Sequence, residues 1–180
     1  MMPALYTFSL LSLMLSGAIF GFFYAWVCST MWGLDAADPA IAIAAMQAMN
    51  ASVRNVVFAP AFFGTPFVLF ATAMLAWFSR LKAAAVIFAS AGLLYLFGSM
   101  MLTLAVNVPM NEVLAAVVIP DDAAEVRRTW EDYSGPWQFW NAVRTLVSGL
   151  SLALTGFAIS KLNPRSAGRL SLAIPDVERV

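Results

Sequence analysis

Long apolar runs alternate with shorter polar stretches along this chain. Four runs of mostly apolar residues cover about 5–31, 56–78, 83–106 and 137–159, and each reaches the ~20 residues that a helix needs to cross a hydrocarbon core of ~30 Å. Lipid offers the backbone no hydrogen bonds, so each run must satisfy its own polar groups as a helix. The pattern therefore predicts an all-α protein, a four-helix transmembrane bundle.

The polar stretch after the first run contains a strong helix start. Asp38 is a typical N-cap residue, and Pro39 suits the first helical turn. We expect a helix from there to about Ala59. Pro60 and Pro66 are then expected to kink or interrupt the second apolar run.

The stretch after the third run predicts two further short helices. Pro109 can begin one that runs toward Ile119, and Asp121 can cap another, which the Ser-Gly-Pro sequence at 134–136 ends. Together with the helix after Asp38, we expect these short extracytoplasmic helices to form an ordered lid over the outer end of the bundle.

Small residues recur on one face of the first run, at Gly17, Gly21 and Ala25. This spacing lets two helix backbones approach each other closely. Packing within one chain is the favoured interpretation, and a homo-oligomer is the alternative.

The composition supports an integral membrane protein, because 62% of the 180 residues are hydrophobic and only 11% are charged. Positively charged side chains favour the cytoplasmic side of a membrane. Arg80 and Lys82 lie in the short turn between the second and third runs, and Lys161, Arg165 and Arg169 follow the fourth run. We therefore expect a multi-pass protein of the inner (cell) membrane with both termini in the cytoplasm, built as one membrane domain, 1–163, and a cytoplasmic tail, 164–180.

Residue types that usually carry redox or metal chemistry are scarce. Cys28 is the single cysteine and histidine is absent, which excludes an internal disulfide, a CxxC relay, imidazole-bound haem and the usual zinc and copper sites. The ten methionines form no repeated motif and fit core packing better than copper binding. The sequence thus predicts neither a metal nor a cofactor. A nucleic-acid partner is not expected either, because the second outer stretch is acidic.

Polar residues enter two of the apolar runs at a similar level. The third run ends in an Asn-Val-Pro-Met-Asn sequence from Asn107 to Asn111, and the fourth run carries Asn141 and Arg144. Arg144 follows Trp137 by two turns, or ~10 Å along a helix. An arginine at the membrane centre costs about 2.5–3.5 kcal/mol even on lenient insertion scales, so Arg144 should face the bundle and find acceptors. A structural polar clamp and a binding pocket predict the same contacts.

We favour a pocket for a flat, apolar ligand that bears a carbonyl or phenol oxygen. Arg144, Asn141 and Asn107 would bind that oxygen, and Asp132 or Tyr133 would act as the base if the ligand reacts. The other candidates would line the pocket as aromatic walls or amide donors: Phe23, Gln47, Asn50, Asn111, Trp130, Trp137 and Trp140.

Several segments together resemble one known family. They are 21–25 (Gly-Phe-Phe-Tyr-Ala), 45–50 (Ala-Met-Gln-Ala-Met-Asn), 107–111, 130–133 (Trp-Glu-Asp-Tyr) and the Trp-Asn-Arg pattern of 137–144. In this order, over nearly the whole chain, they are similar to the DUF1772, or anthrone oxygenase-like, membrane proteins. The resemblance implies a four-helix membrane protein. From some fungal polyketide-pathway members it also implies a cofactor-independent monooxygenase that converts an anthrone to an anthraquinone with O₂.

Two other function classes are compatible with these residues. A non-catalytic membrane protein could bind a hydrophobic aromatic small molecule or a lipid, or serve as an accessory subunit of a membrane complex. A transporter is disfavoured, because the chain shows no inverted repeat and has few helices to form a path.

Overall fold

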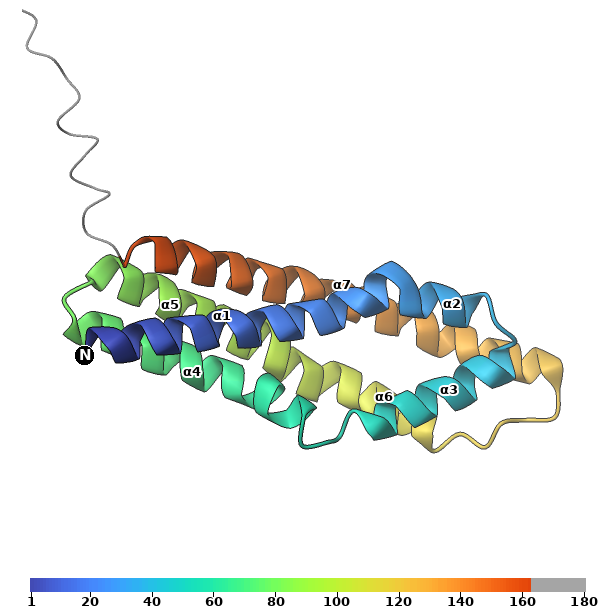
Figure 1. The fold of residues 1–180 in the computed structure, drawn as a ribbon. Coiled ribbons are helices and arrows are strands. Elements are labelled where there is room, and N and C mark those ends of the chain that lie inside the picture. Colours follow the sequence, from blue (N-terminus) through green and yellow to red (C-terminus); the bar gives the residue numbers. More distant parts are fainter. Residues whose placement is uncertain (163–180) are drawn as a thin grey trace, which may run out of the picture.

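The computed structural model describes residues 1–162 as a helical bundle (Figure 1). The first helical stretch consists of α1 (Met2–Ala25), the π-helical η1 (Trp26–Thr30) and α2 (Met31–Asp35). It is followed by α3 (Pro39–Ser52) and α4 (Phe58–Phe78). The third stretch consists of α5 (Lys82–Tyr95), the π-helical η2 (Leu96–Met101) and η3 (Thr103–Asn107), and α6 (Val108–Ala115). The last helix is α7 (Ala123–Ser160).

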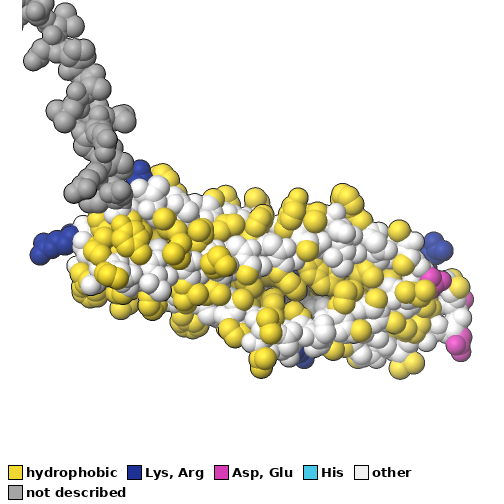
Figure 2. Space-filling model, viewed as in Figure 1, with side chains coloured by type: hydrophobic (Ala, Val, Ile, Leu, Met, Phe, Trp, Pro, Cys, Tyr) yellow, Lys and Arg dark blue, Asp and Glu magenta, His cyan; other side chains and the backbone are white. Residues whose placement is uncertain are grey.

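Four helical stretches are long and apolar enough to cross a membrane: Met2–Asp35, Phe58–Phe78, Lys82–Ala115 and Ala123–Ser160. They confirm the predicted all-α, four-helix bundle and suggest a multi-pass membrane protein. Hydrophobic side chains cover the length of the molecule, whereas Lys, Arg, Asp and Glu gather mainly at its two ends (Figure 2). The predicted cytoplasmic tail, 164–180, lies outside the described residues.

The four long helices form a closed ring in which each packs against two neighbours. α4 packs against α1 and α5, and α7 packs against the same two helices. The N-terminus, the α4–α5 turn and the C-terminal end of α7 lie at one end of the bundle (Figure 1). A core centred on Leu5, Leu69 and Phe88 fills the bundle near that end. The ring therefore leaves α2, α3, α6 and the beginning of α7 to build the opposite end, which is the predicted outer end.

α3 and α4 are separate helices, contrary to the prediction of one helix from Asp38 to about Ala59. Asp38 does cap α3, accepting a hydrogen bond from the Ala40 amide over 2.9 Å. However, α3 ends at Ser52 and α4 begins at Phe58. The side chain of Asn55 accepts hydrogen bonds from the amides of Val57 and Phe58, over 2.8 and 2.9 Å. This asparagine thus supports a new helix start where one continuous helix was expected.

The prolines of α4 do not interrupt it, so of the two expected outcomes, a kink or an interruption, the interruption was wrong. Pro60 lies in the first turn, where no helical N–H bond is lost. Pro66 lies inside the helix and is buried. Packing of α4 against both α1 and α5 holds the helix across this position.

The outer helices are largely continuations of the spans rather than a separate lid. The third stretch continues through Pro109 into α6, which ends at Ala115 and not near Ile119. α7 begins after Asp122, which accepts from the amides of Ala124 and Glu125 over 3.3 Å each, and continues unbroken past 134–136. Both expected helix ends were therefore wrong. A buried hydrophobic cluster packs these helices against one another and so holds them across the prolines; it includes Met31, Ile43, Leu114, Trp130, Tyr133 and Trp137.

The small residues of α1 pack inside the chain less than expected. A Cβ on Gly17 would lie 4.0 Å from the Leu152 side chain, but one on Gly21 would have no neighbour within 4 Å. Ala25 is exposed. The interpretation as a packing face within one chain therefore holds for Gly17 alone.

Candidate functional site

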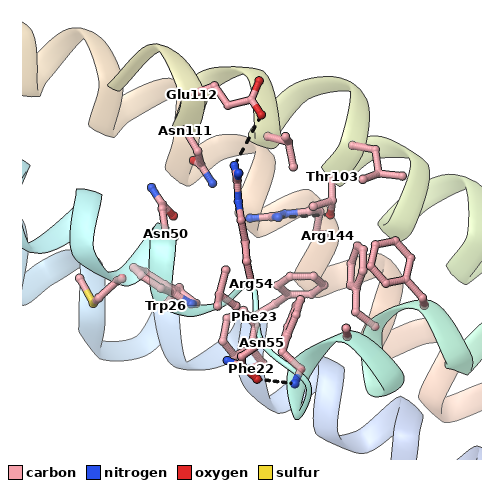
Figure 3. Close-up of a pocket in the computed structure, with 18 of the residues that line it drawn as sticks. Phe22, Phe23, Trp26, Asn50, Arg54, Asn55, Thr103, Asn111, Glu112 and Arg144 are labelled. Atoms are coloured by element: carbon pink, nitrogen blue, oxygen red, sulfur yellow. Dashed lines mark hydrogen bonds and ion pairs between the residues drawn. The ribbon is translucent and has the colours of Figure 1, made fainter. Parts of the chain in front are cut away.

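A cavity of about 610 Å³ opens at the break between α3 and α4 and faces η3 and α6 (Figure 3). Its walls are mostly aromatic and come from α1, η1, α4 and α7: Phe22, Phe23, Trp26, Phe58, Phe62, Phe63 and Trp137. The polar side chains that reach it are Asn50, Arg54, Asn55, Thr103, Asn111, Glu112 and Arg144. Because α3 ends at Ser52 and α4 begins at Phe58, no helical turn fills the space between them, and the cavity opens there.

Arg144 forms the back of the cavity and is only 4% exposed. Its Nη2 donates to Asn141 Oδ1 over 2.9 Å, and its Nη1 donates to Thr103 Oγ1 over 3.2 Å. Asn141 is fixed in turn, since its Nδ2 donates to the Phe23 carbonyl over 3.2 Å. The prediction that Arg144 faces the bundle and finds acceptors there agrees with these contacts.

Among residues 1–162, aromatic rings rather than a carboxylate lie against the guanidinium of Arg144. Its guanidinium carbon lies 4.6 Å from the centroid of the Phe23 ring and 5.4 Å from that of Trp137, within the range of a cation–π interaction. Within residues 1–162 no carboxylate is close enough to Arg144 for an ion pair, and its Nε has no hydrogen-bond partner. A buried cation of this kind favours an anionic or strongly polar oxygen beside it.

A second hydrogen-bond network orients the wall formed by Trp137. Asn111 Oδ1 accepts from Tyr133 Oη and from Trp137 Nε1, each over 2.9 Å. Asn50 Nδ2 contacts the same tyrosine oxygen at 3.4 Å. The Tyr133 hydroxyl is therefore engaged behind the wall, and Tyr133 does not line the cavity.

The structure brings five of the predicted site residues into the cavity: Phe23, Asn50, Asn111, Trp137 and Arg144. Asn141 and Tyr133 support them from behind. Asn107 is fully buried outside the cavity lining, and neither its Nδ2 nor its Oδ1 has a hydrogen-bond partner.

The other predicted residues lie elsewhere. Gln47 Nε2 donates to the carbonyls of Leu114 and Val117, over 2.9 and 3.0 Å, and so connects α3 to the end of α6. Trp130 Nε1 donates to Asp35 Oδ1 over 3.0 Å, which connects α7 to α2. Both are contacts that stabilise the outer end. Asp132 and Trp140 do not line the cavity, and Asp132 is exposed.

An ion pair at the mouth was not predicted. Arg54 Nη2 lies 3.5 Å from Glu112 Oε1, and the two side chains are 63% and 61% exposed. Arg54 extends from the α3–α4 break toward Glu112 on α6, and both side chains line the same cavity as Arg144 (Figure 3). The sequence did contain a signal, because Arg54 follows Asn50 by one turn and Glu112 follows Asn111 directly.

The arrangement suits an apolar aromatic molecule with one polar edge. Rings would pack against the aromatic walls, and an oxygen would face Arg144 and Thr103. Residues 1–162 contain no group of three or more His, Cys, Asp or Glu side chains that could hold a metal ion.

The sequence model of one protein family, described as anthrone oxygenase, matches residues 53–154. The matched segment begins in the α3–α4 break and includes α4 to α6 and most of α7. It therefore contains Arg54, Thr103, Glu112 and Arg144, but not Phe22, Phe23 or Trp26. Among curated proteins and solved structures, none matches the chain significantly.

Proposed function

The chain belongs to the anthrone oxygenase family, and we propose that its cavity binds an anthrone-like or other flat hydrophobic aromatic substrate and oxidises it with O₂ without a cofactor. The observation that carries this proposal is Arg144, a buried cation at the wall of an aromatic cavity that has no acidic partner among residues 1–162. Such a group stabilises negative charge that develops on a ligand oxygen in a water-poor site.

The proposed reaction needs only one activated species. Removal of a proton from the central ring carbon of an anthrone gives an enolate whose charge lies largely on the oxygen, where Arg144 would bind it. This electron-rich anion transfers electrons to O₂. Overall, one anthrone and one O₂ give one anthraquinone and one water, with one oxygen atom entering the new carbonyl and the other leaving in the water.

The cavity mouth favours a substrate that arrives from the membrane. Phe63 and Leu104 line the cavity and are also 46% and 40% exposed, on two neighbouring membrane-spanning stretches. Val56, at the break, is 87% exposed. The cations Arg80, Lys82 and Lys161 lie at the opposite end of the bundle, which supports a cytoplasmic inner end and a cavity in the outer leaflet of the cell membrane.

Anthrone-dependent O₂ uptake tests the proposal. Purified protein in lipid nanodiscs should consume O₂ and form anthraquinone, measured with an oxygen electrode and by absorbance. Arg144→Leu and Asn141→Leu should each abolish uptake, whereas Arg128→Leu, an exposed arginine outside the cavity, should not. Unchanged uptake in both cavity variants, with folding checked by thermal unfolding, would rule out the proposed role of Arg144.

A non-catalytic role is the second candidate, and the mouth supports it as well. An arginine at the level of exposed apolar side chains also suits a lipid or another hydrophobic molecule with an anionic head group, bound by Arg54 and Arg144. Ligand retained in purified protein without O₂ uptake would favour a binding protein. Constant co-purification with another membrane protein would favour an accessory subunit.

A further inference from the structure

We infer that Glu112 is the catalytic base that removes the proton from the substrate carbon. This inference rests on the proposed oxygenase function and assigns the role that the sequence suggested for Asp132 or Tyr133. Glu112 lines the same cavity as Arg144 but comes from a different helix, α6.

Elimination among the described residues leads to this assignment. Glu112 is the only carboxylate among the described residues that line the cavity, and histidine is absent from the whole chain. Asp132 is exposed outside the cavity. The Tyr133 hydroxyl donates to Asn111 and also lies outside the lining. A base must come within hydrogen-bond reach of the proton that it removes, or reach it through one water.

The position of Glu112 suits a base that must pass its proton to water after each turnover. Its side chain is 61% exposed at the mouth, so a proton taken from a ligand inside can pass on to water. Its contact with Arg54 is an exposed ion pair at 3.5 Å, and exposed pairs of this kind are weak. The Glu112 carboxylate can therefore leave Arg54 and turn toward a ligand that lies between Glu112 and Arg144.

The two charged groups divide the proton-transfer step between them. The substrate C–H bond breaks and an O–H bond forms on Glu112. The electron pair of the C–H bond becomes the enolate, with its oxygen beside Arg144. A carboxylate can remove a proton from carbon when an oxyanion site stabilises the enolate that forms. O₂ then oxidises the enolate, and Glu112 releases its proton to water.

Proton exchange without O₂ isolates this step. Anthrone incubated anaerobically in D₂O with protein in nanodiscs should exchange its ring-carbon hydrogens faster than with empty nanodiscs, as followed by NMR or mass spectrometry. Glu112→Gln should slow this enzymatic exchange by roughly 10²–10⁴-fold, the usual contribution of a general base. O₂ uptake should fall in parallel, while anthrone affinity stays within about threefold. Glu112→Asp should recover part of the rate, and Asp132→Asn should match the wild type.

The outcomes distinguish a failure of the Glu112 assignment from a failure of the oxygenase proposal. Wild-type exchange in a folded Glu112→Gln protein would overturn the assignment of Glu112 and leave the oxygenase proposal standing. A wild-type protein that binds anthrone but catalyses neither exchange nor O₂ uptake would overturn the oxygenase proposal and this assignment with it. Folding of Glu112→Gln is expected, because Glu112 is exposed, and thermal unfolding with anthrone binding verifies it.

Discussion

The hydroxyl of fully buried Tyr95 donates a hydrogen bond of 2.9 Å to the backbone carbonyl of Phe62. In a regular helix this carbonyl would accept from the amide of the residue four positions later, but that residue is Pro66, which has no N–H. Tyr95 on α5 therefore supplies the donor that α4 lacks. Because Phe62 lines the cavity, this bond also fixes part of the cavity floor.

Tyr95→Phe should lower the free energy of unfolding by about 1–3 kcal/mol, the cost of leaving a buried carbonyl unsatisfied. Unfolding of the purified protein in detergent, followed by tryptophan fluorescence, measures the change. Tyr6→Phe is the matched control, because Tyr6 is 47% exposed. Equal stability of the two variants would mean that Phe62 is satisfied in another way.

Gly98→Ala should destabilise the bundle where α7 passes η2. A Cβ at this position would lie 2.6 Å from Val147 Cγ1, which is a steric clash, and overpacking of this kind costs about 1–3 kcal/mol. Val147→Ala in the same chain should restore part of the loss, giving a coupling energy in a double-mutant cycle. Gly21→Ala should be tolerated, since no atom lies within 4 Å of its Cβ position. Additive effects at 98 and 147 would contradict the contact.

Two buried asparagines should respond in opposite ways to replacement by leucine. Asn141→Leu removes the partner of Arg144 Nη2 and should cost roughly 1.5–3 kcal/mol, because hydrogen bonds to charged groups are strong. Asn107→Leu removes two unpartnered polar atoms and should raise stability by about 1 kcal/mol. Thermal unfolding in one detergent compares the two. A large loss for Asn107→Leu would instead reveal a bound partner, such as an internal water, at this amide.

Asn111→Ala should cost more stability than Tyr133→Phe. The first change leaves two donors, Tyr133 Oη and Trp137 Nε1, without their shared acceptor. The second removes one donor and the acceptor of a longer contact, 3.4 Å from Asn50 Nδ2. Each unsatisfied buried donor costs about 1–3 kcal/mol. Asn111→Ala should also weaken ligand binding, since Trp137 forms a cavity wall. The comparison uses unfolding and a ligand titration, and equal losses in both variants would contradict the shared acceptor.

The bundle could be predicted because its causes are local in sequence. Each span shows as a continuous apolar run, and Asp38 before Pro39 marks the start of α3. The inward orientation of Arg144 also followed from the chain alone, because a cation within a membrane span must find polar partners. Asn141 lies one turn away on the same helix face, and the structure shows a hydrogen bond between the two side chains.

The cavity could not be located from the sequence because it depends on contacts between distant segments. The Ser-Gly-Pro sequence at 134–136 is a typical helix end, yet buried packing of Trp130 and Trp137 carries α7 through it. Conversely, nothing but Asn55 signals that α3 and α4 are separate helices. One error displaced the expected lid, and the other hid the opening, so the sequence indicated Asp132 or Tyr133 as the base, where we infer Glu112.

The break at 53–57 separates the size of the cavity opening from the packing of the four long helices. Exposed connections accept insertions and deletions at little cost, and α1, α5 and α7 hold the bundle on either side of this connection. Adding or removing a residue there would widen or narrow the mouth without repacking a span. The size of the cavity opening can therefore vary with the length of this connection alone, on an unchanged frame of helices.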